Sequence, residues 1–259
     1  IVFIVALSGS AKVPFTFFAV MYYVTYLMKV VTSYPNPDLD GTASAFAYAE
    51  LLQAIGERAQ VALHGEPDKE ARAALAYWDL TSVFDRGELA KAVEIVLVDT
   101  SNLSDFPRGF DSTKVVEIID HRELHEAKSF PNAKIQIELV GAAATLVAEK
   151  FSIAQLKPQQ PTAGLLFGAI ASNTVSLRSS NTTERDRRMY DLLQPIAAVG
   201  TEYLRLLREA RSQYAPGELA AYLWNDRSVR ETRSKKVTIL QIEAEHAEQL
   251  FRERRVEID

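Results

Sequence analysis

The sequence predicts an α/β protein with a doubly wound, mostly parallel sheet, followed by part of a smaller α/β domain. Two observations support this fold class. Between residues 28 and 198, short β-branched runs alternate with segments that carry apolar residues at helical spacing. Two of the runs, 93–99 and 115–120, are apolar almost throughout, which is typical of strands buried on both faces of a parallel sheet.

The first strand and helix flank a turn that carries two acidic residues. A β-branched run ends at about residue 33, and a helical pattern begins at Thr42. Asp38 and Asp40 lie between them, at the strand edge where open α/β sheets bind ligands. Two carboxylates this close repel each other unless a cation lies between them. Capping of the next helix by Asp40 is the alternative explanation.

The remaining elements continue the alternation up to residue 198. Strands are expected at 60–65, 93–99, 115–120 and 133–140, and helices at 68–78, 142–151, 161–171 and 184–198. Beyond Gly200, charged helices surround one predicted strand at 236–242. A single strand does not form a stable sheet. We therefore expect this second unit to be truncated, or its strand to dock elsewhere.

The predicted organisation has three parts, at 1–27, 28–198 and 199–259. The first is apolar and aromatic, but polar residues and Pro14 interrupt it, and it lacks the basic start of a signal peptide. We interpret 1–27 as non-native sequence, with a membrane anchor as the alternative. The second part is the main domain, with no membrane association expected, and the third is a partial second domain.

Composition narrows the classes of function. The net charge of −5 argues against binding of duplex nucleic acid. The chain has no cysteine, which excludes disulfides and thiolate chemistry and fits a reducing, cytoplasmic location. With only four histidines, a metal site has to rely mainly on carboxylates. The sequence leaves room for a homodimer.

Three predicted strands end in acidic residues. The first leads to Asp38 and Asp40, the third ends at Asp99, and the fourth ends at Asp120 followed by His121. Parallel neighbours would bring these side chains to one edge of the sheet, where buried charges need partners or a metal. Asp and His together suit Mn²⁺, Mg²⁺ or Zn²⁺. Salt bridges to an arginine such as Arg122 or Arg178 are the alternative.

Four short segments, in order, resemble the motifs of the DHH phosphoesterase superfamily. They are Asn36-Pro37-Asp38-Leu39-Asp40, Leu97-Val98-Asp99, Ile119-Asp120-His121-Arg122 and Ala169-Ile170-Ala171-Ser172-Asn173-Thr174. The resemblance is strongest to manganese-dependent (family II) inorganic pyrophosphatases and to exopolyphosphatases. It covers about 28–198 as a catalytic domain, and residues 200–254 look like the start of that family's substrate-closing second domain.

The resemblance implies metal-dependent hydrolysis of phosphoanhydride bonds in pyrophosphate or short polyphosphate, by a water that bridges two ions of Mn²⁺ or Mg²⁺. Carried over, Asp99 would bridge the ions, Asp38 would bind the first, and Asp40 and His121 the second. Asn173 stands at a further ligand position. Substrate phosphate would contact Arg122 and, in the second domain, Lys236. Apart from the resemblance, Arg178 in the polar turn 172–181 is a further candidate for a phosphate contact, with a solvated arginine as the alternative. His121 needs an acceptor for its other ring nitrogen, which the sequence does not identify.

Three positions depart from the family pattern. Tyr34 stands where a histidine ligand is usual, Arg122 replaces the second histidine of the third motif, and Asn173 replaces an aspartate. Arg122 can still contact phosphate as a bidentate donor. Fewer anionic and nitrogen ligands imply weaker metal binding, with one ion lost or a preference for magnesium.

Two other functions stay open. One is a phosphodiesterase that cleaves small nucleotides or oligonucleotides, because the superfamily contains both activities. The other is a catalytically degenerate protein that binds phosphate or a partner, for which the three substituted positions argue.

Overall fold

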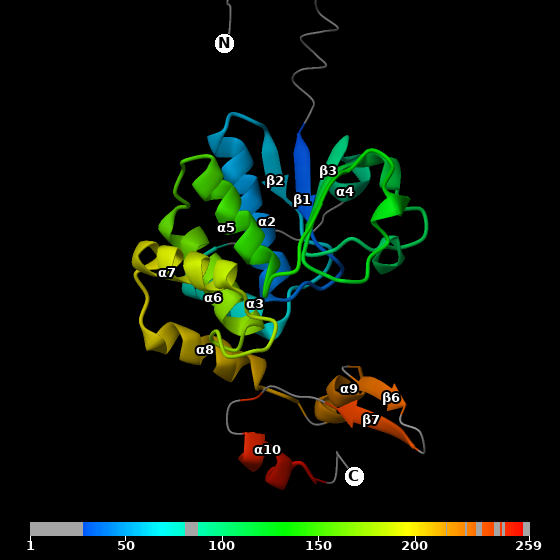
Figure 1. Cartoon of the computed structure of the whole chain (residues 1–259), viewed down its shortest axis with the longest axis vertical. Helices are drawn as coiled ribbons and strands as arrows, with labels where there is room; N and C mark the ends of the chain where they lie inside the picture. Colours follow the sequence, from blue (N-terminus) through cyan, green and yellow to red (C-terminus); the bar gives the residue numbers. More distant parts are fainter. Residues whose placement is uncertain are drawn as a thin grey trace, which may run out of the picture.

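Five parallel strands, in the order β2-β1-β3-β4-β5, form the main sheet (Figure 1). They are β1 Lys29–Thr32, β2 Ala59–Val61, β3 Glu94–Val98, β4 Val115–Asp120 and β5 Lys134–Ile137. This computed structural model describes residues 28–80, 88–215, 217–225, 227–231, 235–240, 244 and 247–255. The predictions for residues 1–27 lie outside these ranges. Within them, no helix is long and apolar enough to cross a bilayer.

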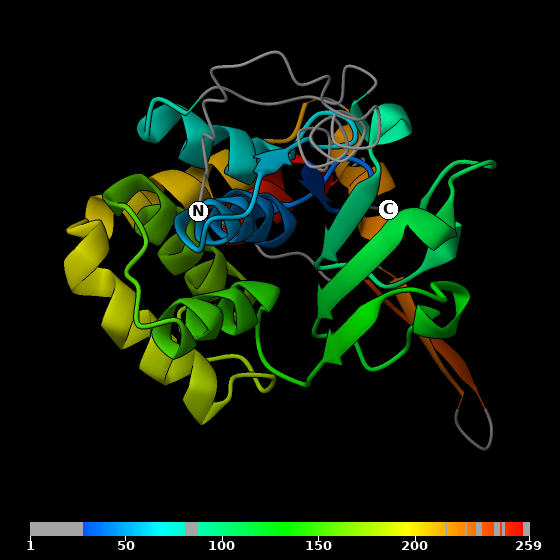
Figure 2. The same ribbon diagram turned by 90° about the horizontal axis from the view of Figure 1, so that it is seen from above.

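Helices and turns cover the sheet on both faces, which confirms the doubly wound α/β fold. The helices are α2 Leu39–Ala54, α3 Lys69–Tyr77, α4 Glu88–Lys91, α5 Ala143–Ile153, α6 Gln160–Asn173, α7 Glu184–Ala197 and α8 Thr201–Arg211. α2 and α5 lie against one face, and α6 and α7 pack against them in turn (Figure 2). The other face of the sheet is covered by α4 and by three 3₁₀ turns, Leu103–Asp105, Ser112–Lys114 and Ala127–Ser129.

The alternation of side chains along the strands explains the two cores. Val96 and Val98 of β3 point into the large core under α2, α5 and α6. Ile95 and Leu97 point into the smaller core with Phe106 of the opposite side. Both faces of each central strand are buried, which explains why apolar runs in the sequence predicted these strands.

The C-terminal part contains α9 Glu218–Asn225, β6 Arg227–Glu231, β7 Lys236–Leu240 and α10 Ala247–Glu253. The expectation that β7 lacks a partner is wrong, because β6 pairs with it antiparallel. The sequence pattern did not predict β6, because its five residues include only one apolar side chain, Val229. α8 contributes Tyr203 and Leu207 to the main core. The domain boundary at 198/199 stays a prediction.

Candidate metal centre

Asp40, Asp99 and His121 bring three donor atoms within 4.8 Å of one another. The Nε2 atom of His121 lies 3.3 Å from Oδ1 of Asp99 and 3.6 Å from Oδ2 of Asp40. Both carboxylates are buried, whereas the histidine side chain is partly exposed. Among the described residues, this is the one such group of three. Carboxylate oxygens and an imidazole nitrogen are a donor set that Mn²⁺ accepts.

The topology of the sheet creates the cluster. β1, β3 and β4 are neighbours and run parallel, so their carboxyl ends meet at one edge. Asp99 follows β3 in the left-handed conformation, with φ of 55°, and its N–H donates to the carbonyl of Ile119 in β4 at 2.8 Å. The chain therefore turns sharply at Asp99 while the residue stays fixed to the neighbouring strand.

Asp40 is held by backbone donors of another helix. Its carboxylate accepts the N–H groups of Ala143 and Ala144, each at 2.8 Å, in the first turn of α5. α5 has no side-chain cap of its own, so Asp40 satisfies its free N–H groups and interacts favourably with its dipole. The alternative that Asp40 caps α2 is wrong. Asp38 is the N-cap of α2 and accepts the N–H of Gly41 at 3.0 Å.

His121 has the acceptor that the sequence could not identify. Its Nδ1 lies 2.9 Å from the backbone carbonyl of Val140. A carbonyl oxygen only accepts hydrogen bonds, so Nδ1 carries the proton and Nε2 faces the two carboxylates. This is the orientation in which a histidine binds a metal, with the second ring nitrogen held by a neighbouring group.

Residues 140–144, which we call the supporting segment, therefore position two of the three donors. Asp186 fixes this segment from the start of α7. Its buried carboxylate accepts the N–H of Gly141 at 2.9 and 3.0 Å and the hydroxyl of Thr145 at 2.6 Å. A side chain at Gly141 would collide with Thr174, 2.5 Å from the added carbon. Sequence reasoning missed these roles, although Thr183 and Asp186 stand at the spacing of a capping box at the start of α7.

The charges of the cluster depend strongly on one another. Burial raises the pKa of Asp40 to about 6, and the charge of Asp38 adds to this effect. Burial and the charges of Asp40 and Asp38 also raise the pKa of Asp99. Burial lowers the pKa of His121, but its hydrogen bond to Asp99 and the two carboxylate charges outweigh this and raise the pKa to about 10. The pair of buried acids thus attracts positive charge, which a divalent cation would supply.

Two of the substituted positions, Tyr34 and Arg122, contact each other. The guanidinium carbon of Arg122 lies 5.2 Å from the centre of the Tyr34 ring, a cation–π arrangement. Nη2 of Arg122 donates to the carbonyl of Asp99 at 3.0 Å, and Nη1 lies 3.4 Å from the carboxylate of Asp105. The tyrosine hydroxyl accepts the N–H of Asp38 at 3.1 Å. The arginine thus holds a permanent positive charge at the edge of the cluster.

The other predicted site residues lie at or beyond this edge. Asn173, at the end of α6, donates from Nδ2 to Asp40 at 2.8 Å, so it stabilises this carboxylate. Asp38 lies outside the group of three donors. Arg178 follows α6, and its Nε donates to the carbonyl of Val175 at 3.1 Å. Lys236 lies on β7, 3.7 Å from Glu231, and is not brought to the cluster. The individual roles assigned to these residues stay predictions.

Residues 29–170 match the family described as "DHH family, N-terminal domain". Probable manganese-dependent inorganic pyrophosphatases of Clostridium acetobutylicum and Thermotoga maritima are similar to this chain. The first is 28% identical over 172 residues, 66% of this chain and 56% of the relative. The second is 30% identical over 179 residues, 68% of this chain and 33% of the relative.

Solved structures agree with this fold. A putative family II inorganic pyrophosphatase of Methanococcus jannaschii superposes with a TM-score of 0.66 at 25% identity, covering 89% of this chain and 77% of the other. An exopolyphosphatase-related protein of Bacteroides fragilis superposes with a TM-score of 0.58 at 13% identity, over 82% and 66% of the chains, which shows the fold alone. The chain spans about half the length, or less, of the curated relatives described above.

Proposed function

We propose that this chain, which belongs to the DHH family, is a metal-dependent hydrolase of phosphoanhydride bonds in inorganic pyrophosphate or short polyphosphate. The match confirms the family that the four motifs predicted. The observation that carries the proposal is the buried cluster of Asp40, Asp99 and His121 at the carboxyl edge of the sheet. The substrate class rests on the names of the similar pyrophosphatases.

The donor set fits Mn²⁺ or Mg²⁺, with Asp40, Asp99 and His121 as the protein ligands. When bound, such an ion lowers the pKa of a coordinated water and neutralises charge that develops on phosphoryl oxygens. The described residues supply one group of three donors, so we propose one firmly bound ion per chain. Tyr34 offers a neutral hydroxyl, and burial together with the charges of Asp38 and Asp99 raises its pKa far above the usual range. It therefore stays protonated and does not supply a phenolate ligand in place of the histidine that is usual at this position.

The chain's own residues orient and neutralise the substrate. Arg122 is two-thirds buried and keeps its charge, since the carboxylates of Asp99 and Asp120 raise its pKa against the effect of burial. Its guanidinium group can donate two parallel hydrogen bonds to phosphate oxygens. The ring of Tyr34 holds this group beside the cluster. Val140 and Asn173 keep His121 and Asp40 in position.

Phosphate release from pyrophosphate tests the proposal. Turnover is expected with Mn²⁺ or Mg²⁺, none with chelator, and a loss of more than roughly 100-fold in Asp99→Asn, because a ligand matters at least as much as its supporting groups. Asp191→Asn, the same change at an exposed position of α7, is the control. Activity that survives both chelator and Asp99→Asn would refute a metal-dependent reaction at this cluster. Faster cleavage of a dinucleotide than of pyrophosphate would favour a phosphodiesterase.

The amide of Asn173 favours a second candidate, a protein that binds phosphate without turnover. It donates a hydrogen bond to Asp40 where the family has a further anionic ligand. The double variant Tyr34→His/Asn173→Asp separates the two candidates. A silent wild type with an active double variant would support the second candidate, whereas an active wild type would exclude it.

A further inference from the structure

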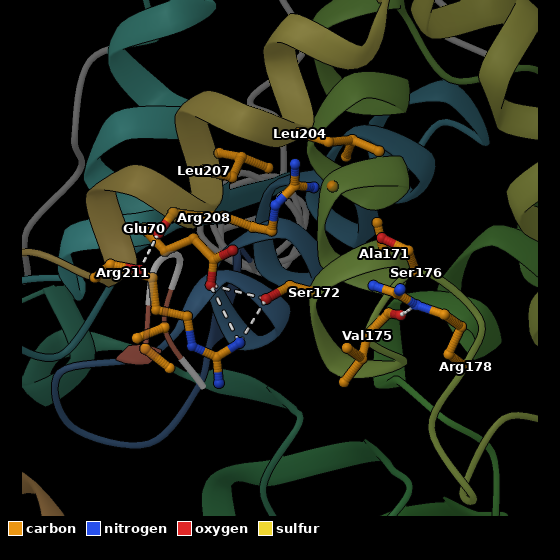
Figure 3. Close-up of a pocket in the computed structure, with 14 residues that line it drawn as sticks. Glu70, Ala171, Ser172, Val175, Ser176, Arg178, Leu204, Leu207, Arg208 and Arg211 are labelled. Atoms are coloured by element: carbon orange, nitrogen blue, oxygen red, sulfur yellow. Dashed lines mark hydrogen bonds and ion pairs between the residues drawn. The ribbon is translucent and has the colours of Figure 1, made fainter. Parts of the chain in front are cut away.

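A cavity of about 460 Å³ lies between α3, α6 and α8, with Ala244 and Ala247 of the C-terminal part also in its wall. Three arginines line it, Arg178 from the segment after α6 and Arg208 and Arg211 from the last turns of α8. Figure 3 shows Arg211 close to Glu70 and Ser172, while Arg178 lies on the other side near Ser176. Positive side chains from two separate elements thus face one space.

The position of Arg208 and Arg211 near the C-terminus of α8 also stabilises that helix through its dipole. This explanation does not extend to Arg178, which belongs to a different element. Among the described residues of the cavity wall, the one acid is Glu70, whose carboxylate accepts the hydroxyl of Ser172 at 2.8 Å and lies 3.9 Å from Arg211. Three cations therefore face one anion.

Glu70 contributes less negative charge than an ordinary glutamate. It is 4% exposed, and burial raises its pKa to about 7 despite the opposing charge of Arg211. At neutral pH the described lining therefore carries a net positive charge, with serine hydroxyls among the guanidinium groups. Guanidinium and hydroxyl donors are the groups that proteins use to bind phosphate oxygens.

The cavity and the cluster share the end of α6. Ser172 lines the cavity, and the next residue, Asn173, donates to Asp40 of the cluster. Consecutive Cα atoms are about 3.8 Å apart, so two adjacent residues of α6 connect the wall of the cavity to the Asp40 carboxylate. A linear chain of phosphates held at the cluster by one end can extend into a cavity this close.

We propose that this cavity binds the distal phosphates of an inorganic oligophosphate, so that the protein favours chains of three or more phosphates over pyrophosphate. The preference in catalysis rests on the proposed function, but the binding does not. Arg178 and Arg208 are the contacts to test, because both are exposed at the surface of the cavity and their removal leaves the core intact.

Binding is measured by calorimetry with sodium tripolyphosphate, on the whole chain in excess chelator and at low salt, so that no metal at the cluster contributes. We expect binding by the wild type and a loss of at least about 10-fold in Arg178→Gln/Arg208→Gln, since each lost charge-assisted contact is worth about that factor or more. The control Arg188→Gln/Arg205→Gln removes the same charge from exposed arginines that do not line the cavity. It should bind within about twofold of the wild type. Thermal melts verify that each variant is folded.

Three results would overturn the proposal: no binding by the wild type, equal loss in both double variants, or unchanged binding in Arg178→Gln/Arg208→Gln. ATP more than about tenfold tighter than tripolyphosphate would show that a base is recognised instead of a bare phosphate chain. If the wild type also hydrolyses these substrates, the ratio of kcat/KM for tripolyphosphate to that for pyrophosphate should fall in the cavity variant and not in the control. If it hydrolyses neither, the calorimetry still decides whether the cavity binds oligophosphate.

Discussion

The carboxylate of Asp186 offers the sharpest test of how the centre is supported. It is fully buried and accepts the N–H groups of Gly141 and Thr183 and the hydroxyls of Thr145 and Thr183, at 2.6 to 3.0 Å. Asp186→Asn preserves the shape but puts an NH₂ group where Oδ2 accepts the N–H of Thr183. One partly buried backbone donor, the N–H of Thr183, then loses its acceptor, and the remaining bonds lose their charge.

The expected cost follows from these contacts. An unsatisfied buried donor costs about 1–3 kcal/mol, and each bond that changes from a charged to a neutral acceptor loses about 1 kcal/mol. The smaller desolvation cost of an amide offsets part of the sum. We therefore expect the free energy of unfolding to fall by about 3 kcal/mol. For a protein of this size, the melting temperature would then fall by roughly 6–12 °C.

Urea titration and thermal melts of Asp186→Asn measure the loss directly, and Asp191→Asn on the exposed side of the same helix should behave as the wild type. Because Gly141 belongs to the supporting segment, Mn²⁺ affinity should also fall by about 10-fold or more, as for other groups that hold metal ligands. A destabilisation below about 1 kcal/mol would refute the argument that this carboxylate organises the segment.

Three further predictions concern the metal, pH and the substituted amide. Mn²⁺ should raise the melting temperature of the wild type, and atomic absorption should find one ion bound per chain. Asp99→Asn should abolish this shift in melting temperature. A shift that persists in the variant would place the ion elsewhere. The folded-state pKa of Glu70 is raised to about 7, whereas its unfolded value is about 4.5, so ionisation of Glu70 destabilises the fold as the pH rises. In urea titrations, the stability of the wild type relative to Glu70→Gln should therefore fall by about 3 kcal/mol between pH 4.5 and pH 8. Parallel stability curves of the two proteins would contradict this. Asn173→Asp should lower the metal-free melting temperature by opposing Asp40, yet bind Mn²⁺ more tightly by calorimetry. Gln155→Glu, an amide-to-acid change at an exposed position, should change neither. Unchanged metal affinity in Asn173→Asp would show that the position is no ligand site.

The sequence carried most of the fold because the central strands are buried on both faces. Runs such as 93–99 then contain almost only apolar residues, and the acids that follow them mark the edge of the sheet. The sequence did not predict β6, because a surface strand of a two-stranded sheet needs no apolar pattern. Its charged side chains are compatible with a loop, and only the pairing with β7 identifies it as a strand.

The donors of the site could be predicted, but their supports could not. Asp40, Asp99 and His121 can be identified by their residue types and by their positions after predicted strands. The partner of His121 is a backbone carbonyl, and that of Asp40 is a pair of backbone N–H groups. Every residue has such groups, so no side chain in the sequence marks them. The contact between Tyr34 and Arg122 is equally hidden, since it joins segments 88 positions apart.

Support by backbone groups has a consequence for how this protein tolerates change. Within the supporting segment, the groups that hold the donors are the Val140 carbonyl and the Ala143 and Ala144 amides, whose positions depend on chain length and not on side-chain chemistry. Apart from Gly141, where no side chain fits, substitutions that suit the local packing preserve these groups. A one-residue insertion or deletion here would move the carbonyl relative to the amides and separate His121 from Asp40. The centre is thus more sensitive to the length of the supporting segment than to the identity of its side chains.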